Sequence, residues 1–502
     1  MNGRVLASLA LTLLAGPAFA AEPSDGPRKL AGRIDRLLAA RWTDERVVPV
    51  GRSEDAEFLR RAYLDLTGKI PPVGVVRCFL ADPAPDKRRV LIERLLDGPG
   101  YVTHFSALWR ELLVLDPDAD SGRQAALADL ERWLHRQFAA NVPYDRLARE
   151  LLTLSLEAAR PKAGAEPLLP TPRLFYLGRE EKPEELAAGM TRVFLGIRLE
   201  CAQCHNHPHA KWTREHFWSQ AALFAGLNAP EVRRELMIPG TEQKVAARFL
   251  DGSALPAASI DPRAALADWM TAPRNPFFAR AAVNRLWEHF FGIGIVDPVD
   301  DMTTENEPSH PELLAELATA FEQARYDLKF LIRALMLSDA YQLTSVESRT
   351  PPPSDARFFS RMNVKALRPA EVFDSIIEAT GYRPADLARQ RARLLARFPR
   401  VDRRLEGQGS IPQALALMNG ELLTAATRPG GDHTLGAVLA SPFLDTEAKI
   451  ETLFLAALGR PPRAAERDRL VRFIADAGDN RERAFGDVLW ALLNSAEFIH
   501  NH

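Results

Sequence analysis

The residues best suited to chemistry form one short segment, Cys201-Ala202-Gln203-Cys204-His205. This Cys-x-x-Cys-His spacing is typical of a covalently attached c-type haem. Two thiols reach the two vinyl groups of the porphyrin, and the next residue supplies an axial imidazole to the iron. On this interpretation Cys201 and Cys204 form thioethers, and His205 is the proximal ligand.

The distal side of such a haem has several candidate ligands, whereas His207 is too close in sequence to reach it. The candidates are His216, His209, Met190 and His104, with an open position as the alternative. A Met or His ligand favours electron transfer, and an open position favours ligand binding or peroxide chemistry. Four aromatic side chains are expected to wall off the porphyrin: Phe194, Trp212, Phe217 and Trp218.

A second interpretation is a bare metal ion, because two thiolates and two imidazoles make a tetrahedral zinc site. Pro208 favours an extended backbone at His207, and side chains two residues apart in an extended chain point to one side. The candidate ligands are Cys201, Cys204, His205 and His207, with His209 as a further one. This alternative describes an exported metal-binding protein or a metal-dependent hydrolase.

A third interpretation is a structural or interaction module in which Cys201 and Cys204 form a disulfide, with solvated histidines beside it. The spacing of the residues leaves all three interpretations open. No Gly-x-Ser-x-Gly elbow and no Ser/His/Asp arrangement is evident, so the sequence supports no particular enzyme class.

The N-terminus has the pattern of an export signal. Arg4 is followed by an apolar run from Val5 to Ala15, and small residues end the segment at Ala20. The run is shorter than the roughly 20 residues needed to span a bilayer. We therefore expect a signal peptide at 1–20, a periplasmic or secreted protein and no membrane span. Export agrees with haem attachment, which takes place outside the cytoplasm.

Composition narrows the possible partners. The formal net charge of the 502 residues is -2, and we expect no nucleic-acid partner because such proteins usually carry a basic patch. Three cysteines are too few for a disulfide scaffold. The third, Cys78, has apolar neighbours in sequence and is predicted to be a buried, inert thiol.

Apolar residues recur mainly at helical spacing, which predicts a mainly α protein with two helical domains. The clearest amphipathic segments are 54–67, 86–96, 122–139, 275–291, 327–338, 367–380, 448–459 and 484–498. A stretch rich in Pro, Gly and Ala at 228–262 is expected to be an irregular linker, with a short extended piece at 245–250. The predicted domains are therefore 28–227 and 263–500.

Two local signals belong to the second half. Ser309 and Glu312 have the spacing of a capping box before a helix, and Gly292 is expected to end the helix before it. The acidic residues between Gly292 and Ser309 suggest a Ca²⁺ site, but their spacing is not that of an EF-hand loop. They are Asp297, Asp300, Asp301, Glu305 and Glu307. We expect a polar loop there.

Several longer motifs resemble a known pair of families. The sequence EDAEFLRRAYLDLTGKIPP at 54–72, with the cysteine segment and the stretch 217–226, resembles the DUF1549 family, also called PSCyt2. The second half resembles its partner family, DUF1553 or PSD1. The motifs that carry this likeness are ALADW (265–269), NPFFAR (275–280), VNRLW (283–287), GIGIVD (292–297), PSHPELL (308–314), SDAY (338–341), IPQAL (411–415), LMNG (417–420) and LWALLNSAEF (489–498).

The resemblance implies an exported, cytochrome-like protein of planctomycetes and related bacteria, with an unknown redox partner. Family context implies sulfatase-like proteins as possible partners and a link to the breakdown of complex carbohydrate. One departure stands at the site itself. Family members commonly have Cys-His-Asp-His-Pro-Phe-Asp, whereas this chain has Asn206, His209 and Ala210 at the Asp, Phe and second Asp positions. Any orienting role of those acids is weakened here, and His209 is a possible substitute ligand.

Overall fold

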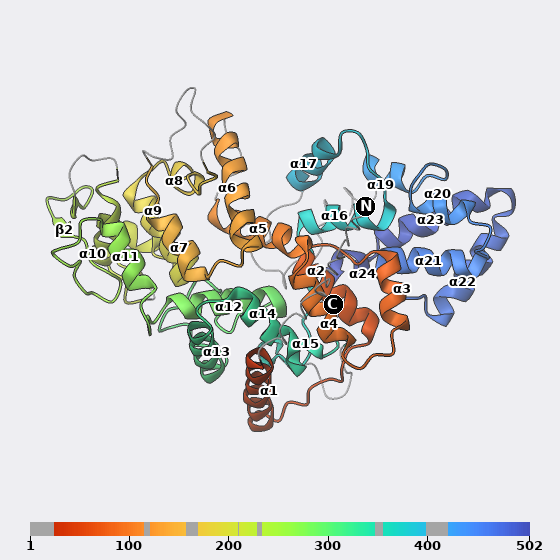
Figure 1. Ribbon diagram of the computed structural model, residues 1–502, viewed down its shortest axis with the longest axis horizontal. Coiled ribbons are helices and arrows are strands. Elements are labelled where there is room, and N and C mark those ends of the chain that lie inside the picture. The colour runs from red at the N-terminus through yellow and green to blue at the C-terminus, as the bar shows by residue number, and fades with distance from the viewer. Residues whose placement is uncertain are drawn as a thin grey trace, which may run out of the picture.

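The computed structural model describes residues 25–114, 121–156, 169–208, 210–227, 233–346, 355–397 and 420–502. Helices dominate these residues, and the strands form only two short antiparallel pairs (Figure 1). The predicted mainly α class is confirmed. The predicted signal peptide at 1–20, the tail motifs at 411–419 and His209 lie outside the described residues.

The first half of the chain contains ten α-helices and three short helical turns among its described residues. The helices are α1 (Gly26–Asp44), α2 (Asp55–Thr67), α3 (Val73–Ala81), α4 (Lys87–Leu96), α5 (Pro99–Leu113), α6 (Ser121–Ala139), α7 (Tyr144–Leu152), α8 (Leu174–Leu177), α9 (Pro183–Met190) and α10 (Arg214–Ala221). A π-helical turn spans Thr191–Leu195, and 3₁₀ turns span Glu200–Gln203 and Ala222–Phe224.

The second half continues the helical pattern. Its helices are α11 (Pro262–Met270), α12 (Phe278–Phe291), α13 (Pro311–Gln323), α14 (Leu328–Leu337), α15 (Asp339–Gln342), α16 (Pro369–Thr380), α17 (Leu387–Arg397), α19 (Glu421–Ala426), α20 (Thr434–Ala440), α21 (Thr446–Leu458), α22 (Ala464–Asp476), α23 (Arg481–Leu493) and α24 (Ala496–Ile499). Short 3₁₀ turns span Ala356–Phe358 and Gly478–Asn480, and the strands are β1 (Glu235–Met237), β2 (Lys244–Ala246), β3 (Lys365–Ala366) and β4 (His500–Asn501).

Local sequence explains why many of these helices form where they do. In α2, Asp55 and Glu57 lie in the first turn, where their charge favours the helix dipole. Every residue from Phe58 to Leu66 is buried, so the helix lies inside the protein. Gly68 then ends the helix with a left-handed φ of 68°, which glycine adopts without a Cβ penalty. Gly292 ends α12 in the same way, with φ 84°, as predicted.

Two hydrophobic cores organise the described residues. The larger core takes side chains from both halves of the chain, and α1 packs along α14 within it. The smaller core gathers α16 and α19 to α24, together with Leu64 and Ile70 from the first half. Figure 1 shows the helices of this smaller core beside α2 and α3, away from α7 to α11. The two halves therefore share both cores.

The described part of the predicted linker is packed against its neighbours. β1 pairs antiparallel with β2, and this hairpin contacts α10. The predicted extended piece at 245–250 overlaps β2. Farther along, Phe249 stacks on Trp269 with ring centroids 5.2 Å apart. These contacts bring the hairpin next to the helix that follows the cysteine segment.

A buried polar cluster ties distant parts of the chain together. Asp65 on α2 accepts hydrogen bonds from Lys365 Nζ at 2.7 Å, Asn501 Nδ2 at 2.7 Å and Tyr341 Oη at 2.8 Å. The side chains of Asp65 and Lys365 are both 0% exposed. Lys365 also donates to the backbone oxygens of His289 and Phe290 in the last turn of α12. The second half and the C-terminus are thus fixed to α2.

Two local predictions are wrong. Cys78 is exposed, because α3 buries Val76 and Phe79 and places the thiol on another face. The capping box at Ser309 does not form, since α13 begins after His310 without a side-chain cap and Ser309 Oγ donates to Ile295 O instead. No described helix has the length and apolarity required to cross a membrane.

Candidate functional site

The cysteines lie on a short, irregular connection between α9 and α10. After the π-helical turn, Gly196 adopts a left-handed φ of 67° and redirects the chain. Ile197, Leu199 and Ala202 are each 0% exposed and anchor the connection in the larger core. Because the apolar residues take the inner positions, Cys201 and Cys204 face solvent, and both are free thiols.

His205 continues the exposed surface of the site. Its Nδ1 hydrogen bonds to the backbone oxygen of Asn206 at 2.8 Å. A carbonyl oxygen can only accept, so Nδ1 carries the proton and Nε2 keeps its lone pair in the neutral ring. This arrangement matches that of metal-binding histidines, in which one nitrogen donates to an oxygen and the other binds the metal.

Asn206, one of the departures from the family pattern, has a role in capping α10. Its Oδ1 accepts the backbone N–H of Arg214, the first residue of that helix, at 3.0 Å. A side-chain oxygen at this position satisfies one of the N–H groups that a helix start leaves without a partner. An Asn is therefore sufficient for capping at this position.

The start of α10 also holds the cysteine segment in place. Gln203 O accepts hydrogen bonds from Trp218 Nε1 at 3.1 Å and from Arg214 Nε at 3.3 Å. The same guanidinium donates through Nη2 to Pro239 O in the hairpin turn, at 2.6 Å. The backbone between the two thiols is therefore tied to both α10 and the β1–β2 hairpin.

The four aromatic residues expected to wall off a porphyrin are already packed in the larger core. Phe194 and Phe217 are 0% exposed, Trp212 is 2% exposed and Trp218 is 4% exposed. They are side chains of this core, and Trp218 also donates through Nε1 to Gln203 O. In this structure the Cys/His site is a surface site.

Three of the four distal-ligand candidates lie in the described residues, and each has surroundings of its own. Met190 is fully buried in α9, and His104 is buried in α5, where its ring lies 5.8 Å from that of His289. His216 is exposed, but its Nδ1 accepts the backbone N–H of Thr213 at 3.1 Å as part of a capping box. That bond places the proton of the neutral ring on Nε2, which is the wrong tautomer for binding iron through that atom.

The zinc interpretation requires at least three ligands to converge. Across the ranges that the structure describes, no group of three or more His, Cys, Asp or Glu side chains is arranged to hold a metal ion. His207 is half-buried, and its backbone N–H donates to Trp212 O at 2.8 Å. Cys201, Cys204, His205 and His207 therefore do not form a ready tetrahedral site, and His209 lies outside the described residues.

The residues at the site fit covalent haem attachment by their chemistry. Two accessible thiols with the required spacing are followed by an accessible imidazole in the tautomer that binds a metal through Nε2. These are the residues needed to attach the porphyrin and to hold one face of the iron. When bound, haem would supply one-electron redox chemistry.

Sequence reasoning missed the partner that reaches the site from the second half. Asp300 accepts hydrogen bonds from Arg192 and Arg198, which flank the turn before Cys201. Burial lowers the pKa of Arg198, but the hydrogen bond and charge of Asp300 outweigh this effect and raise it overall. A separation of about a hundred residues leaves no local pattern. The acidic residues of the loop could be identified in the sequence, but the two arginines that Asp300 contacts could not.

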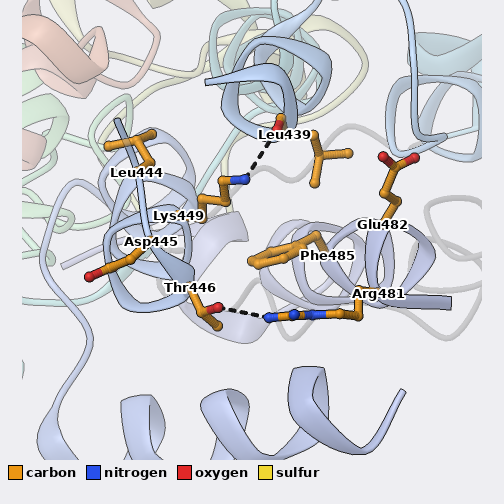
Figure 2. Close-up of a pocket in the computed structure, with 8 residues that line it drawn as sticks. All are labelled: Leu439, Leu444, Asp445, Thr446, Lys449, Arg481, Glu482 and Phe485. Carbon is orange, nitrogen blue, oxygen red and sulfur yellow. Dashed lines mark hydrogen bonds between the residues drawn. The ribbon is translucent and has the colours of Figure 1, made fainter. Parts of the chain in front are cut away.

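A cavity of about 320 Å³ lies elsewhere, between α20, α21 and α23 (Figure 2). Phe485 and two leucines supply its apolar surface, and its charges are balanced by Lys449, Arg481, Asp445 and Glu482. Lys449 Nζ donates to Leu439 O at 3.1 Å, and Arg481 donates to Thr446 Oγ1 at 3.0 Å. None of its lining residues belongs to the Cys/His segment.

Two family models match the chain. PSCyt2, described as a protein of unknown function (DUF1549), matches residues 33–229, and PSD1, described as a protein of unknown function (DUF1553), matches residues 262–395. No curated protein and no solved structure matches. The Cys/His segment thus lies in the PSCyt2 region and Asp300 in the PSD1 region, whereas the cavity lies beyond both.

Proposed function

Because the chain belongs to the two-domain family that joins PSCyt2 to PSD1, we propose that it is an exported, cytochrome-like protein with one covalent haem. Cys201 and Cys204 would form the thioethers, and His205 would bind the iron. The function that follows from this chemistry is electron transfer outside the cytoplasm. The proposal rests on the donor set, since both family descriptions leave function open.

The observation that carries the proposal is the hydrogen bond between His205 Nδ1 and Asn206 O. It selects the tautomer with a free lone pair on Nε2, and it limits rotation of the ring. His205 is therefore already prepared to bind a metal through Nε2 while its backbone remains on the exposed turn.

The two thiols are held in position by the backbone between them. Ala202 is fully buried, and Gln203 O is held by α10, so the backbone between Cys201 and Cys204 is anchored on its inner side. Anchoring fixes the spacing of the thiols while leaving their sulfur atoms accessible. This is what two bond-forming steps on one porphyrin require, because each thiol must reach its own vinyl group.

His209, the fourth distal candidate from the sequence, lies outside the described residues. Met190 and His104 are buried elsewhere, and His216 is occupied in capping α10. From its place in the sequence, we propose that His209 would bind the second face of the haem iron. Replacing it with alanine should leave the haem attached and convert its spectrum from low spin to high spin. An unchanged spectrum would exclude His209 and leave an exogenous ligand.

The test is expression of the full chain with its own signal in a host that carries cytochrome c maturation genes. We expect a haem-stained band under denaturing conditions and an intact mass increased by one haem. Cys201→Ala/Cys204→Ala should abolish both signals. Cys78→Ala is the matched control, because it removes another exposed thiol, and it should leave both signals unchanged.

A wild-type protein without haem, from cells that mature their own cytochromes, would contradict the proposal. Zinc analysis and thiol counting on that protein would then separate the two remaining chemistries. One zinc per chain, lost in Cys201→Ala/Cys204→Ala, would support the metal site. Two fewer free thiols without zinc would support the Cys201–Cys204 disulfide.

A further inference from the structure

The backbone that leads into Cys201 is bound to a loop from the PSD1 region. Gly196 O accepts the backbone N–H of Met302 at 2.9 Å, and Ile197 pairs with Asp301 in an antiparallel bridge. These contacts join segments more than a hundred positions apart, directly before the turn that bears the first thiol. The loop, residues 297–307, is thus a structural neighbour of the site.

Asp300 strengthens this junction with its carboxylate. Oδ1 accepts from Arg198 Nε at 2.8 Å and from Nη2 at 2.7 Å, while Oδ2 accepts from Arg192 Nε at 3.0 Å. The Asp300 side chain is only 7% exposed, whereas the two arginine side chains are 40% and 50% exposed. Charge-assisted hydrogen bonds are the stronger class, and partial removal from water reduces their screening.

The same turn is held at a third point. The backbone oxygen of Arg192 accepts from Arg285 Nη2 on α12 at 3.1 Å. Gly196 is enclosed by the junction, since an added Cβ would lie 2.8 Å from Met302 Sδ and 3.2 Å from the Ala281 side chain. The turn between α9 and Cys201 is therefore fixed by backbone, charged and steric contacts, all from the second half.

We propose that Asp300 is a positioning residue of the Cys/His site and that the PSD1 region is required, in the same chain, to hold the thiols in place. Asp300 acts through Arg192 and Arg198, which fix the backbone at both ends of the turn. The relevance to haem rests on the proposed function. The positioning itself is a property of the protein and is measured without haem.

The experiment uses the full chain without bound haem and compares Asp300→Asn with wild type. Glu307→Gln is the matched control, because it neutralises an exposed acid of the same loop. Hydrogen exchange over residues 196–205 should accelerate by about tenfold in Asp300→Asn, since a charge-assisted bond is lost. The alkylation rates of Cys201 and Cys204 should change relative to the rate of Cys78. Cys78 is exposed on α3 and serves as an internal reference.

Unchanged exchange over 196–205 in Asp300→Asn would overturn the proposal, as would an equal change in Glu307→Gln. A second variant tests whether faster exchange is local or results from general unfolding. Arg198→Gln removes a half-exposed arm of the cluster, and it should reproduce part of the local acceleration without a change in melting temperature. The double variant should show less than the sum of the two effects, because both remove the same interaction.

Haem content then connects this inference to function. In cells with maturation genes, Asp300→Asn should attach less haem than Glu307→Gln at equal protein yield. If the wild-type protein attaches none, the proposed function fails, while the exchange data still decide the positioning claim. If Asp300→Asn accelerates exchange but attaches haem at the wild-type level, Asp300 holds the backbone without positioning the thiols, and the proposal is overturned.

Discussion

The polar cluster around Asp65 and the Cys/His segment place reactive side chains in opposite surroundings. Asp65 and Lys365 are fully buried and paired, and Asn501 and Tyr341 complete the cluster. Cys201, by contrast, is exposed on a short turn whose apolar neighbours alone reach the core. Polar side chains thus have two uses in this molecule. Buried ion pairs fix how distant segments of the chain pack together. Exposed thiols and imidazoles remain available to a ligand.

The largest expected effect comes from breaking the buried pair. Lys365→Met leaves the Asp65 carboxylate buried without its cation, and we expect the free energy of unfolding to fall by about 3–5 kcal/mol. Urea unfolding followed by circular dichroism measures this loss. The matched control is Arg357→Met in an exposed pair with Asp355, which should cost under about 1 kcal/mol. Similar losses in both variants would remove the contrast.

A smaller effect is expected where the site meets the PSD1 region. Gly196→Ala combines a left-handed backbone with a Cβ against Met302, and it should cost about 3 kcal/mol. Gly240→Ala isolates the backbone contribution, because Gly240 has φ 74° and no atom lies within 4 Å of an added Cβ. Its expected cost is about 1 kcal/mol. Equal melting temperatures for the two variants would show that the junction has room to relax.

Acidification should reveal the buried histidine at the start of α13. Burial, assisted by the charge of Arg41, lowers the pKa of His310 to about 4. An unfolded histidine titrates near 6.5, so the unfolded state takes up the proton first as pH falls. Stability is therefore lost from about pH 6.5 down to about pH 4, by roughly 2–3 kcal/mol from this group. His310→Phe should flatten that part of the profile, and a profile identical to wild type would contradict the assignment.

The variant expected to change stability least is also the one expected to lose haem attachment. Cys201→Ala/Cys204→Ala removes two exposed thiols, and the free energy of unfolding should change by under about 0.5 kcal/mol. Chemical denaturation of the haem-free protein makes the comparison with wild type fair. A loss of several kcal/mol would show that the thiols are structural, as a disulfide or a metal site would require.

Sequence periodicity predicts the helices well because helical order is local. The segment expected at 54–67 is α2 at Asp55–Thr67, and the segment expected at 327–338 is α14 at Leu328–Leu337. The Cys-x-x-Cys-His motif is equally local, so its donor chemistry could be identified without a structure. Whether these residues bind haem stays a prediction.

The features that the sequence does not predict depend on which distant segments of the chain come into contact. Nothing in the spacing of Trp212 or Trp218 indicates that their rings are buried in the larger core. Likewise, the exposure of Cys78 depends on which face α3 turns to its neighbours, and the nearby Val76 and Phe79 do not show this in the sequence. The bond from Asp300 to Arg198 spans 102 positions. Such long-range contacts are set by tertiary packing, which short sequence patterns do not encode.

The most direct test of the central claim is mass spectrometry of one tryptic peptide. Cleavage after Arg198 and Lys211 releases residues 199–211, which contain both thiols and His205. From protein exported by cells that mature cytochromes, we predict that this peptide carries one haem bound through Cys201 and Cys204. Full recovery of the unmodified peptide from those cells would contradict the claim that this exposed segment is a haem-attachment site.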